Sequence, residues 1–226
     1  MSFSPERLLL YGVTDRAWVG DMSFLEQIED ALKGGVTLLQ LREKNLNEAE
    51  LIGQAVQVKA LCSKYGVPLI INDNPEAAIK SGADGVHVGA EDMPIAKIRK
   101  LAGMDFIIGA TAKTVEQAVQ AQADGADYLG VGAVFPSSVK KNAVGITLEK
   151  LKEISSGVSI PCAAIGGIDC GNIHRLAGSG ISGIAVVSAV FGQEDIYKGT
   201  SRLLTRVKCI LGREGFDENS TVYCRQ

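Results

Sequence analysis

The chain has 226 residues, of which 46% are hydrophobic and 22% are charged, and its formal net charge is −3. This length allows one large domain with a substantial core, and the slightly negative charge argues against a nucleic-acid partner. No apolar run reaches the roughly 18 residues of a membrane span, and no leader pattern opens the sequence, so we expect a cytoplasmic protein without a membrane partner. The five cysteines form no C-x-x-C pair, which favours reduced thiols.

Short apolar segments alternate with amphipathic segments along the chain. Strands are predicted at 8–14, 37–42, 68–72, 85–89, 106–110, 128–135, 161–167 and 183–190. Helices are predicted at 23–33, 47–65, 75–81, 94–101, 114–123, 147–154, 172–178 and 195–211. These elements predict one domain over residues 1–211. The polar residues 212–226 are predicted to form a disordered tail.

A glycine ends the predicted helix before every second strand. Gly34, Gly82, Gly125 and Gly180 each precede a short link and an apolar strand. This repetition predicts a module of two β/α units that recurs until the sheet closes on itself. Eight such units in a chain of this length predict a (β/α)₈ or TIM barrel, and a doubly wound open sheet is the alternative.

Two acidic residues follow successive predicted strands. In a (β/α)₈ barrel the functional groups lie past the C-terminal ends of the strands. Asn74 before Pro75 already fits as a helix N-cap, which leaves Asp73 without that role. Asp92 could instead cap the helix predicted at 94–101. Two carboxylates at neighbouring strand ends predict a site for Mg²⁺ that is bound through a phosphate.

Basic and polar side chains leave the second predicted strand on one face. Gln40, Arg42 and Lys44 alternate with Leu41 and Glu43. An amide, a guanidinium fork and an ammonium group on a shared face suit the oxygens of a pyrophosphate. A surface charge cluster is the alternative.

Three later segments could complete a phosphate site. Residues 136–145 form a long loop with hydroxyls and two lysines, which is either a phosphate-covering lid or a solvated loop. Gly166-Gly167 and Val187-Ser188 follow the last two strands, where backbone N–H groups often bind phosphate. His87 lies inside the fourth predicted strand and is equally consistent with a satisfied residue of the barrel interior.

Together these motifs resemble the thiamine-phosphate synthase family. The resemblance extends from Leu10 to Ala189 and places six motifs in the family's order. They are Gln40-x-Arg42-x-Lys44, Asn72-Asp73, His87-x-Gly89-x-x-Asp92, Phe135-Pro136 with Lys140-Lys141, Ile165-Gly166-Gly167-Ile168 and Val187-Ser188.

The resemblance implies a transferase of thiamine biosynthesis. Such an enzyme joins 4-amino-2-methyl-5-(diphosphooxymethyl)pyrimidine to a thiazole phosphate and releases pyrophosphate, so its partners are small molecules. It implies one Mg²⁺ ion held by Asp73 and Asp92, and it leaves open whether the chain is a homo-oligomer. The pyrimidine pyrophosphate would contact Gln40, Leu41, Arg42, Glu43, Lys44, Asn72, Thr111 and Lys140, and among these Arg42, Thr111 and Lys140 would be catalytic. The thiazole phosphate would contact Ser137, Ser138, Val139, Gly167, Val187 and Ser188.

The sequence departs from the family pattern in the lid and at the fifth strand. The family's Pro-Thr-x-Thr-Lys is here Pro-Ser-Ser-Val-Lys, and Val139 has no hydroxyl. The affinity for the thiazole phosphate is therefore expected either to be weaker or to rest on Ser137 and backbone N–H groups. Thr111 replaces a common serine and keeps its hydroxyl. Two rivals are the related thiazole tautomerases, which resemble this chain in fold but use a histidine where it has Ala133, and a non-catalytic ligand sensor.

Overall fold

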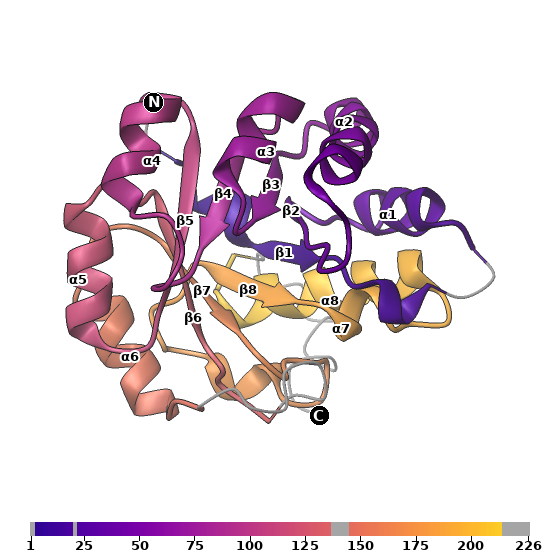
Figure 1. Cartoon of the computed structure of the whole chain (residues 1–226). Coiled ribbons are helices and arrows are strands. Elements are labelled where there is room, and N and C mark those ends of the chain that lie inside the picture. Colours follow the sequence, from indigo (N-terminus) through magenta and orange to yellow (C-terminus); the bar gives the residue numbers. More distant parts are fainter. Residues whose placement is uncertain (1–2, 20–21, 137–144, 214–226) are drawn as a thin grey trace.

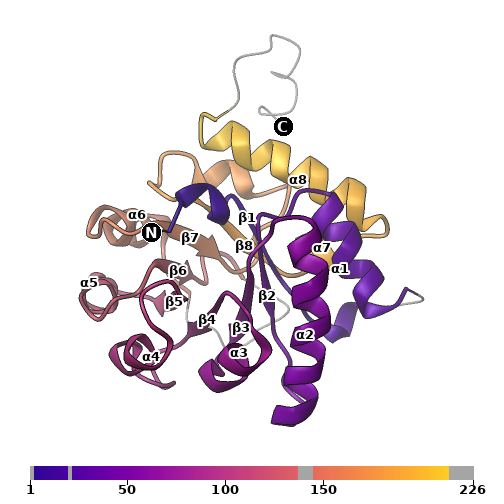
Figure 2. The same cartoon turned by 90° about the horizontal axis from the view of Figure 1, so that it is seen from above.

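The computed structural model describes residues 3–19, 22–136 and 145–213. Within them, eight parallel strands close into a barrel in chain order, with β8 paired to β1 (Figure 2). The strands are β1 (Leu10–Val13), β2 (Leu38–Leu41), β3 (Leu69–Asn72), β4 (Gly85–Val88), β5 (Ile107–Ala112), β6 (Tyr128–Gly132), β7 (Cys162–Ile165) and β8 (Gly183–Val186). The predicted (β/α)₈ barrel is confirmed, and the alternative of an open sheet is wrong.

Helices surround the barrel and cover the outer face of its strands (Figures 1 and 2). They are α1 (Phe24–Lys33), α2 (Glu48–Lys64), α3 (Pro75–Ser81), α4 (Ile95–Ala102), α5 (Val115–Ala123), α6 (Leu148–Ser156), α7 (Ser188–Phe191) and α8 (Ile196–Ile210). Three 3₁₀ turns complete the description: η1 (Pro5–Leu8), η2 (Arg16–Trp18) and η3 (Ile173–Leu176). No helix in the described ranges is long and apolar enough to cross a bilayer.

Two predicted elements near the C-terminus differ from the structure. The helix predicted at 172–178 is only the turn η3, because Gly178 and Gly180 adopt positive φ angles of 72° and 80° and end the helical conformation. The strand predicted at 183–190 stops at Val186, and the short helix α7 begins at Ser188. The apolar run there gave no signal for this change from strand to helix.

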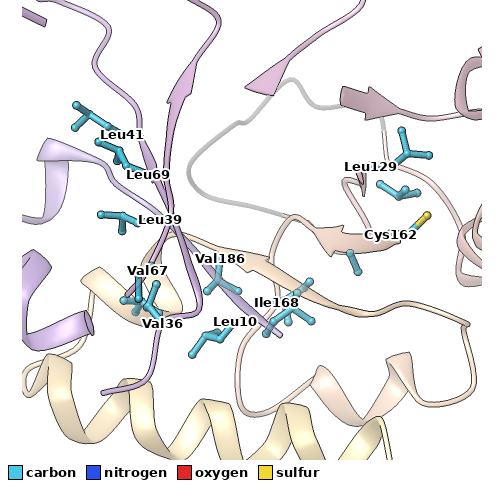
Figure 3. Close-up of a cluster of buried hydrophobic side chains, with 14 of the residues drawn as sticks. Leu10, Val36, Leu39, Leu41, Val67, Leu69, Leu129, Cys162, Ile168 and Val186 are labelled. Carbon is cyan, nitrogen blue, oxygen red and sulfur yellow. The ribbon is translucent and has the colours of Figure 1, made fainter. Parts of the chain in front are cut away.

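Side chains pack on both faces of the strands. An outer cluster between strands and helices includes Leu10, Leu39, Leu41, Leu69 and Leu129 (Figure 3). A smaller inner cluster fills the barrel and includes Tyr11, Leu38, Ile70, Tyr128 and Ala185. Burial on both faces explains why the strands are nearly continuous apolar runs. Alternation along each strand therefore decides which side chains can reach the interior.

Three of the four glycine-containing links before the even-numbered strands share one bonding pattern. Thr37 Oγ1 accepts a hydrogen bond from the backbone N–H of Leu10, the first residue of β1, at 2.9 Å. Asp84 and Asp127 do the same for Leu69 and Ile108, each at 2.7 Å. Each side chain thereby ties an even-numbered strand to the odd-numbered strand before it. This supports the two-unit module that the glycine spacing predicted.

The cysteines differ in part from the expectation of reduced thiols. Cys62, Cys162 and Cys170 are free. Cys209, at the end of α8, is disulfide-bonded, so the expectation is wrong for this residue. The spacing of the cysteines gave no indication of this bond. The predicted tail, apart from Gly212 and Arg213, also lies outside the described residues.

Candidate active site

Asp73 lies at the C-terminal end of β3 in an uncommon backbone conformation. Its φ is 60°, and it is the one non-glycine residue with positive φ in the described ranges. Its N–H donates to the carbonyl of His87 on β4 at 2.9 Å. Asn74 caps α3 by accepting from Ala77 N–H at 2.8 Å, as predicted. Asp73 therefore has no capping role.

Asp92 closes the turn after β4. Its Oδ2 accepts from Gly89 N–H at 2.7 Å, so the spacing from Gly89 to Asp92 corresponds to a tight turn. Helix α4 begins at Ile95 after Pro94, and no side chain caps its N-terminus. The alternative role of Asp92 as a helix cap is therefore not observed.

Asp92 lies close enough to Asp73 to affect the ionisation of that carboxyl group. Burial is the main cause that raises the pKa of Asp73, and the charge and hydrogen bonding of Asp92 raise it further. The amide of Asn72 and the positive charge of Arg42 act in the opposite direction. The structure thus brings together Asp73, Asp92, Asn72 and Arg42 from β2, β3 and β4.

Gln40 and Leu41 point to opposite faces of β2, as the predicted alternation requires. Gln40 is 5% exposed and makes a hydrogen bond inside the barrel, whereas Leu41 packs in the outer cluster. Glu43 pairs with Arg16, with 2.8 Å between Arg16 Nε and Glu43 Oε2, and its side chain is 4% exposed. The backbone N–H of Arg42 donates to the hydroxyl of Thr14 at 3.0 Å. The side chain of Leu41 therefore faces away from the interior.

A row of polar groups crosses the barrel interior. Gln40 Nε2 donates to the Tyr11 hydroxyl at 2.5 Å, and that hydroxyl lies 2.8 Å from the Tyr128 hydroxyl. Tyr128 lies 3.2 Å from His87 Nδ1, and His87 Nε2 lies 3.0 Å from Thr111 Oγ1. Residues of five strands are connected in this way. The interpretation of His87 as a satisfied barrel residue is confirmed.

Burial keeps the interior of this row uncharged. It lowers the pKa of His87 to about 4, although the charge of Asp92 acts the other way. It also raises the pKa of Tyr11 and of Tyr128. Sequence reasoning missed both tyrosines; the available signal was their place on the inward face of apolar strands.

Two glycines make room for the polar row. A Cβ atom on Gly109 would lie 2.1 Å from Tyr128 Cζ and 2.5 Å from His87 Nδ1. A Cβ atom on Gly130 would lie 3.1 Å from His87 Cε1. Gly130 belongs to the Gly-Val-Gly segment of β6, so these glycines serve packing inside the barrel.

The ends of β6 and β7 run side by side at the same end of the barrel. Phe135 N–H donates to the Gly166 carbonyl at 3.1 Å. A Cβ atom on Gly167 would lie 2.2 Å from the Pro136 carbonyl oxygen, so only glycine fits there. Val187 and Ser188 stand at the start of α7. Most of the predicted lid lies outside the described residues. This part includes Ser137, Ser138, Val139, Lys140 and Lys141.

The acid pair has the composition of a magnesium site that a ligand completes. In the described part of the chain, no group of three or more His, Cys, Asp or Glu side chains could hold a metal. Asp73 and Asp92 supply two carboxylates, and Mg²⁺ is commonly bound by one or two carboxylates with substrate phosphates and water. The nearby charge of Arg42 suits such a phosphate.

Comparisons with known proteins identify the family. Residues 10–190 match the family model for thiamine monophosphate synthase. The thiamine-phosphate synthase of Desulfitobacterium hafniense (strain Y51) is 51% identical over 187 residues, which cover 82% of this chain and 90% of that protein. That of Clostridium tetani is 46% identical, over 86% and 93% of the two chains. The thiamine phosphate pyrophosphorylase of Pyrococcus furiosus superposes with a TM-score of 0.84 at 39% identity, over 92% and 99%.

A fourth comparison supports the barrel fold alone. The structure of a 3-hexulose-6-phosphate synthase superposes with a TM-score of 0.63 at 16% identity. The higher identities extend over most of both chains, and the range matched by the family model, residues 10–190, contains all eight strands and the acid pair. The chain is therefore an enzyme that belongs to the thiamine monophosphate synthase family.

Proposed function

We propose that the chain condenses 4-amino-2-methyl-5-(diphosphooxymethyl)pyrimidine with a thiazole phosphate, and that the reaction depends on Mg²⁺. The products are thiamine phosphate and pyrophosphate. The observation that carries the proposal is the acid pair Asp73 and Asp92 beside Arg42, at one end of a barrel of this family. The roles of the other site residues are proposed from their places near that pair.

The acid pair fits a bound Mg²⁺ ion. The charge of Asp92 disfavours the ionised form of Asp73, which the raised pKa of Asp73 reflects. Asp73 is also held in a strained conformation that its neighbours determine. When bound, Mg²⁺ would supply positive charge to the oxygens of the departing pyrophosphate. Asp73 and Asp92 are the residues that would hold it.

The remaining residues of the site would bind and orient the pyrimidine substrate. The bond between the methylene carbon and the pyrophosphate oxygen breaks, and pyrophosphate leaves with the electron pair. The thiazole nitrogen then gives its lone pair to that carbon. Arg42 would stabilise the negative charge on the leaving group. Asn72 and Gln40 would orient the substrate, with Thr111 as a further polar group, so no protein nucleophile is needed.

Several other residues remain part of the proposal. Lys140 would join Arg42 at the pyrophosphate, and Lys44 would add charge at the end of β2. Leu41 packs in the outer cluster, so a contact from it would come from its backbone. Glu43 would contact the substrate beside it. Ser137, Ser138, Val139, Gly167, Val187 and Ser188 would bind the thiazole phosphate.

Product formation from the two purified substrates tests this proposal. Wild type should form thiamine phosphate with Mg²⁺ and lose activity with a chelator. Asp92→Ala and Arg42→Ala should each reduce kcat/KM by about tenfold or more. Asp124→Ala is the matched control, because Asp124 follows α5 at the opposite end of the barrel, and it should retain activity.

The outcomes separate the function from the site. If folded wild type makes no product, the proposed function fails, and a tautomerase or a ligand sensor becomes the better account. Product that survives both substitutions would keep the function and contradict the assignment of Asp92 and Arg42.

A further inference from the structure

The polar row in the barrel interior can be analysed hydrogen by hydrogen. Gln40 Nε2 donates to the Tyr11 hydroxyl, so Tyr11 receives a hydrogen at its oxygen and must place its own hydrogen elsewhere. The neighbouring acceptor is the Tyr128 hydroxyl at 2.8 Å. Tyr128 in turn has His87 Nδ1 at 3.2 Å. Both tyrosines are at most 1% exposed, so an unplaced hydroxyl hydrogen would be costly.

This constraint fixes the form of His87. If Tyr128 donates to Nδ1, that nitrogen carries no hydrogen, and Nε2 carries the one hydrogen of a neutral imidazole. Nε2 then donates to Thr111 Oγ1 at 3.0 Å. A protonated His87 would place hydrogens on both nitrogens and leave the Tyr128 hydroxyl hydrogen without an acceptor. Each hydrogen in the row is used once only when His87 is neutral.

The two ends of the row remain available to a ligand. Gln40 Oε1 accepts no hydrogen bond from the described residues. Thr111 is partly exposed. Within the described residues, its side chain makes one hydrogen bond, the one to His87. Gln40 therefore presents an acceptor, and Thr111 presents a hydroxyl hydrogen.

We propose that Tyr11, Tyr128 and His87 are positioning residues that form a one-directional hydrogen-bond chain from Gln40 to Thr111. This hydrogen-bond chain fixes an acceptor at Gln40 and a donor at Thr111. The two groups match the ring edge of a planar heteroaromatic substrate that carries both an amino group and a ring nitrogen. An amino group would donate to Gln40 Oε1, and a ring nitrogen would accept from Thr111. This deepens the proposed function, because it assigns the polarity with which the pyrimidine ring is bound.

The packing supports a precise arrangement of this chain. Gly109 and Gly130 leave space for the His87 ring, and a Cβ atom on Gly109 would overlap Tyr128. Phe3 stacks on Tyr128 with a centroid separation of 5.2 Å. The rings are therefore held from the sides, and their hydrogen-bonding atoms remain aligned along the row.

The tautomer of His87 tests the direction of the chain without any substrate. The protein has two histidines, so His174→Gln leaves His87 as the single imidazole signal in a ¹⁵N NMR spectrum. His174 is exposed on η3 and is not one of the residues that form the hydrogen-bond chain. A neutral imidazole with hydrogen on Nε2 is the expected result at pH 7. Hydrogen on Nδ1 would reverse the chain, and a charged ring would break it; either result overturns the proposal.

Kinetics of Tyr128→Phe and Tyr11→Phe test the positioning role. Each variant removes one hydroxyl and keeps the ring, and each should raise KM for the pyrimidine pyrophosphate by about tenfold while KM for the thiazole phosphate stays within about twofold. The double variant should be little worse than either single one, because one break already disconnects the chain. Tyr65→Phe, which removes an exposed hydroxyl bonded to Glu29, is the control and should match wild type.

Additive losses that affect both substrates equally would indicate ordinary structural roles and overturn the positioning claim. If wild type makes no thiamine phosphate at all, the proposed function and the assigned substrate fail together. The NMR result still decides the direction of the chain in that case, so the two failures are distinguishable.

Discussion

Asp73 combines an uncommon backbone conformation with a carboxylate that Asp92 repels. A non-glycine residue at φ 60° costs on the order of 1 kcal/mol unless its side chain suits the conformation, and asparagine and aspartate suit it best. Burial and Asp92 together raise the pKa of Asp73 in the folded chain. Such a combination is common where a protein prepares a binding site at the expense of its own stability.

Asp73→Asn should therefore stabilise the metal-free protein. The substitution keeps a side chain that tolerates positive φ and removes one of two interacting carboxylates. Because Asp73 is exposed and solvent screens this repulsion, we expect a gain of only about 0.5 kcal/mol in unfolding free energy. Urea unfolding at pH 7 with a chelator measures it, and activity should be lost in the same variant. A loss of stability would contradict the account of the acid pair.

The sign of the pH effect follows from the direction of the shift. Because Asp73 has a higher pKa when folded than its ordinary value of 3.8, the folded chain holds its proton more tightly. The contribution of Asp73 to the free energy of unfolding therefore declines as the pH rises from 3.8 through the raised pKa. In urea unfolding at several pH values, this decline should be absent from Asp73→Asn.

His87 contributes to stability with the opposite sign. Its pKa falls from 6.5 to about 4 on burial, so the unfolded chain binds the proton more tightly between those values. Stability should fall by up to about 3 kcal/mol as pH drops from 6.5 to 4. His87→Gln should lose this component, which the difference between the two urea-unfolding pH profiles measures. Parallel profiles would contradict the neutral, buried state of His87.

At the scale of elements, the strands β5 and β6 depend on glycine for the polar row. In Gly109→Ala the new methyl would collide with the Tyr128 ring, and we expect a loss of about 3 kcal/mol or more in unfolding free energy. Gly53→Ala is the matched control, since nothing lies within 4 Å of the new methyl in the middle of α2. That control should gain about 0.5–1 kcal/mol. Equal effects of the two substitutions would argue against the packing described here.

The links before β4 and β6 depend on an aspartate that is both a backbone acceptor and an ion-pair partner. Asp84 accepts from Leu69 N–H and lies 2.7 Å from Lys59 Nζ. Asp84→Ala would leave the Leu69 N–H without its partner, and we expect a loss of about 1–3 kcal/mol in thermal or urea unfolding. Asp84→Asn can still accept from Leu69 and should lose less. If the two variants lose the same amount, the ion pair rather than the strand link carries the effect.

Most elements could be predicted from local chemistry. The helix starts at Phe24, Glu48 and Pro75 follow side chains that cap them, and the apolar runs mark the strands to within a few residues. The turn η3 and the helix α7 were missed because their identity depends on backbone conformation near glycines and on closure of the barrel. A sequence pattern does not contain that information.

At the scale of the whole molecule, the barrel has a closed end and a polar end. Phe3 and Leu8 pack against the inner cluster near the N-terminal side of the strands. The acid pair, Arg42 and the partly exposed Thr111 lie toward the other side, past or at the strand ends. Side chains fill the barrel interior between its two ends. In the described part of the chain, a substrate can therefore enter only from the polar end.

The candidate site was predictable where strand ends carry chemical groups. Asp73, Asp92 and Arg42 could be grouped because parallel strands bring their C-terminal ends together. Tyr11 and Tyr128 could not be assigned a role, because their bonds join strands that are distant in sequence and depend on the register of the closed barrel. The sequence therefore predicts the groups that face a substrate better than the groups that hold them in place.

The most direct test of the central claim is the binding of inorganic pyrophosphate by calorimetry, with and without Mg²⁺, to wild type and Asp92→Asn. If Asp73 and Asp92 hold a metal that carries the leaving group, wild type should bind pyrophosphate at least about tenfold more tightly with Mg²⁺, and Asp92→Asn should lose this gain. Equal binding with and without Mg²⁺, or an undiminished gain in Asp92→Asn, would contradict the account of the acid pair as the metal site.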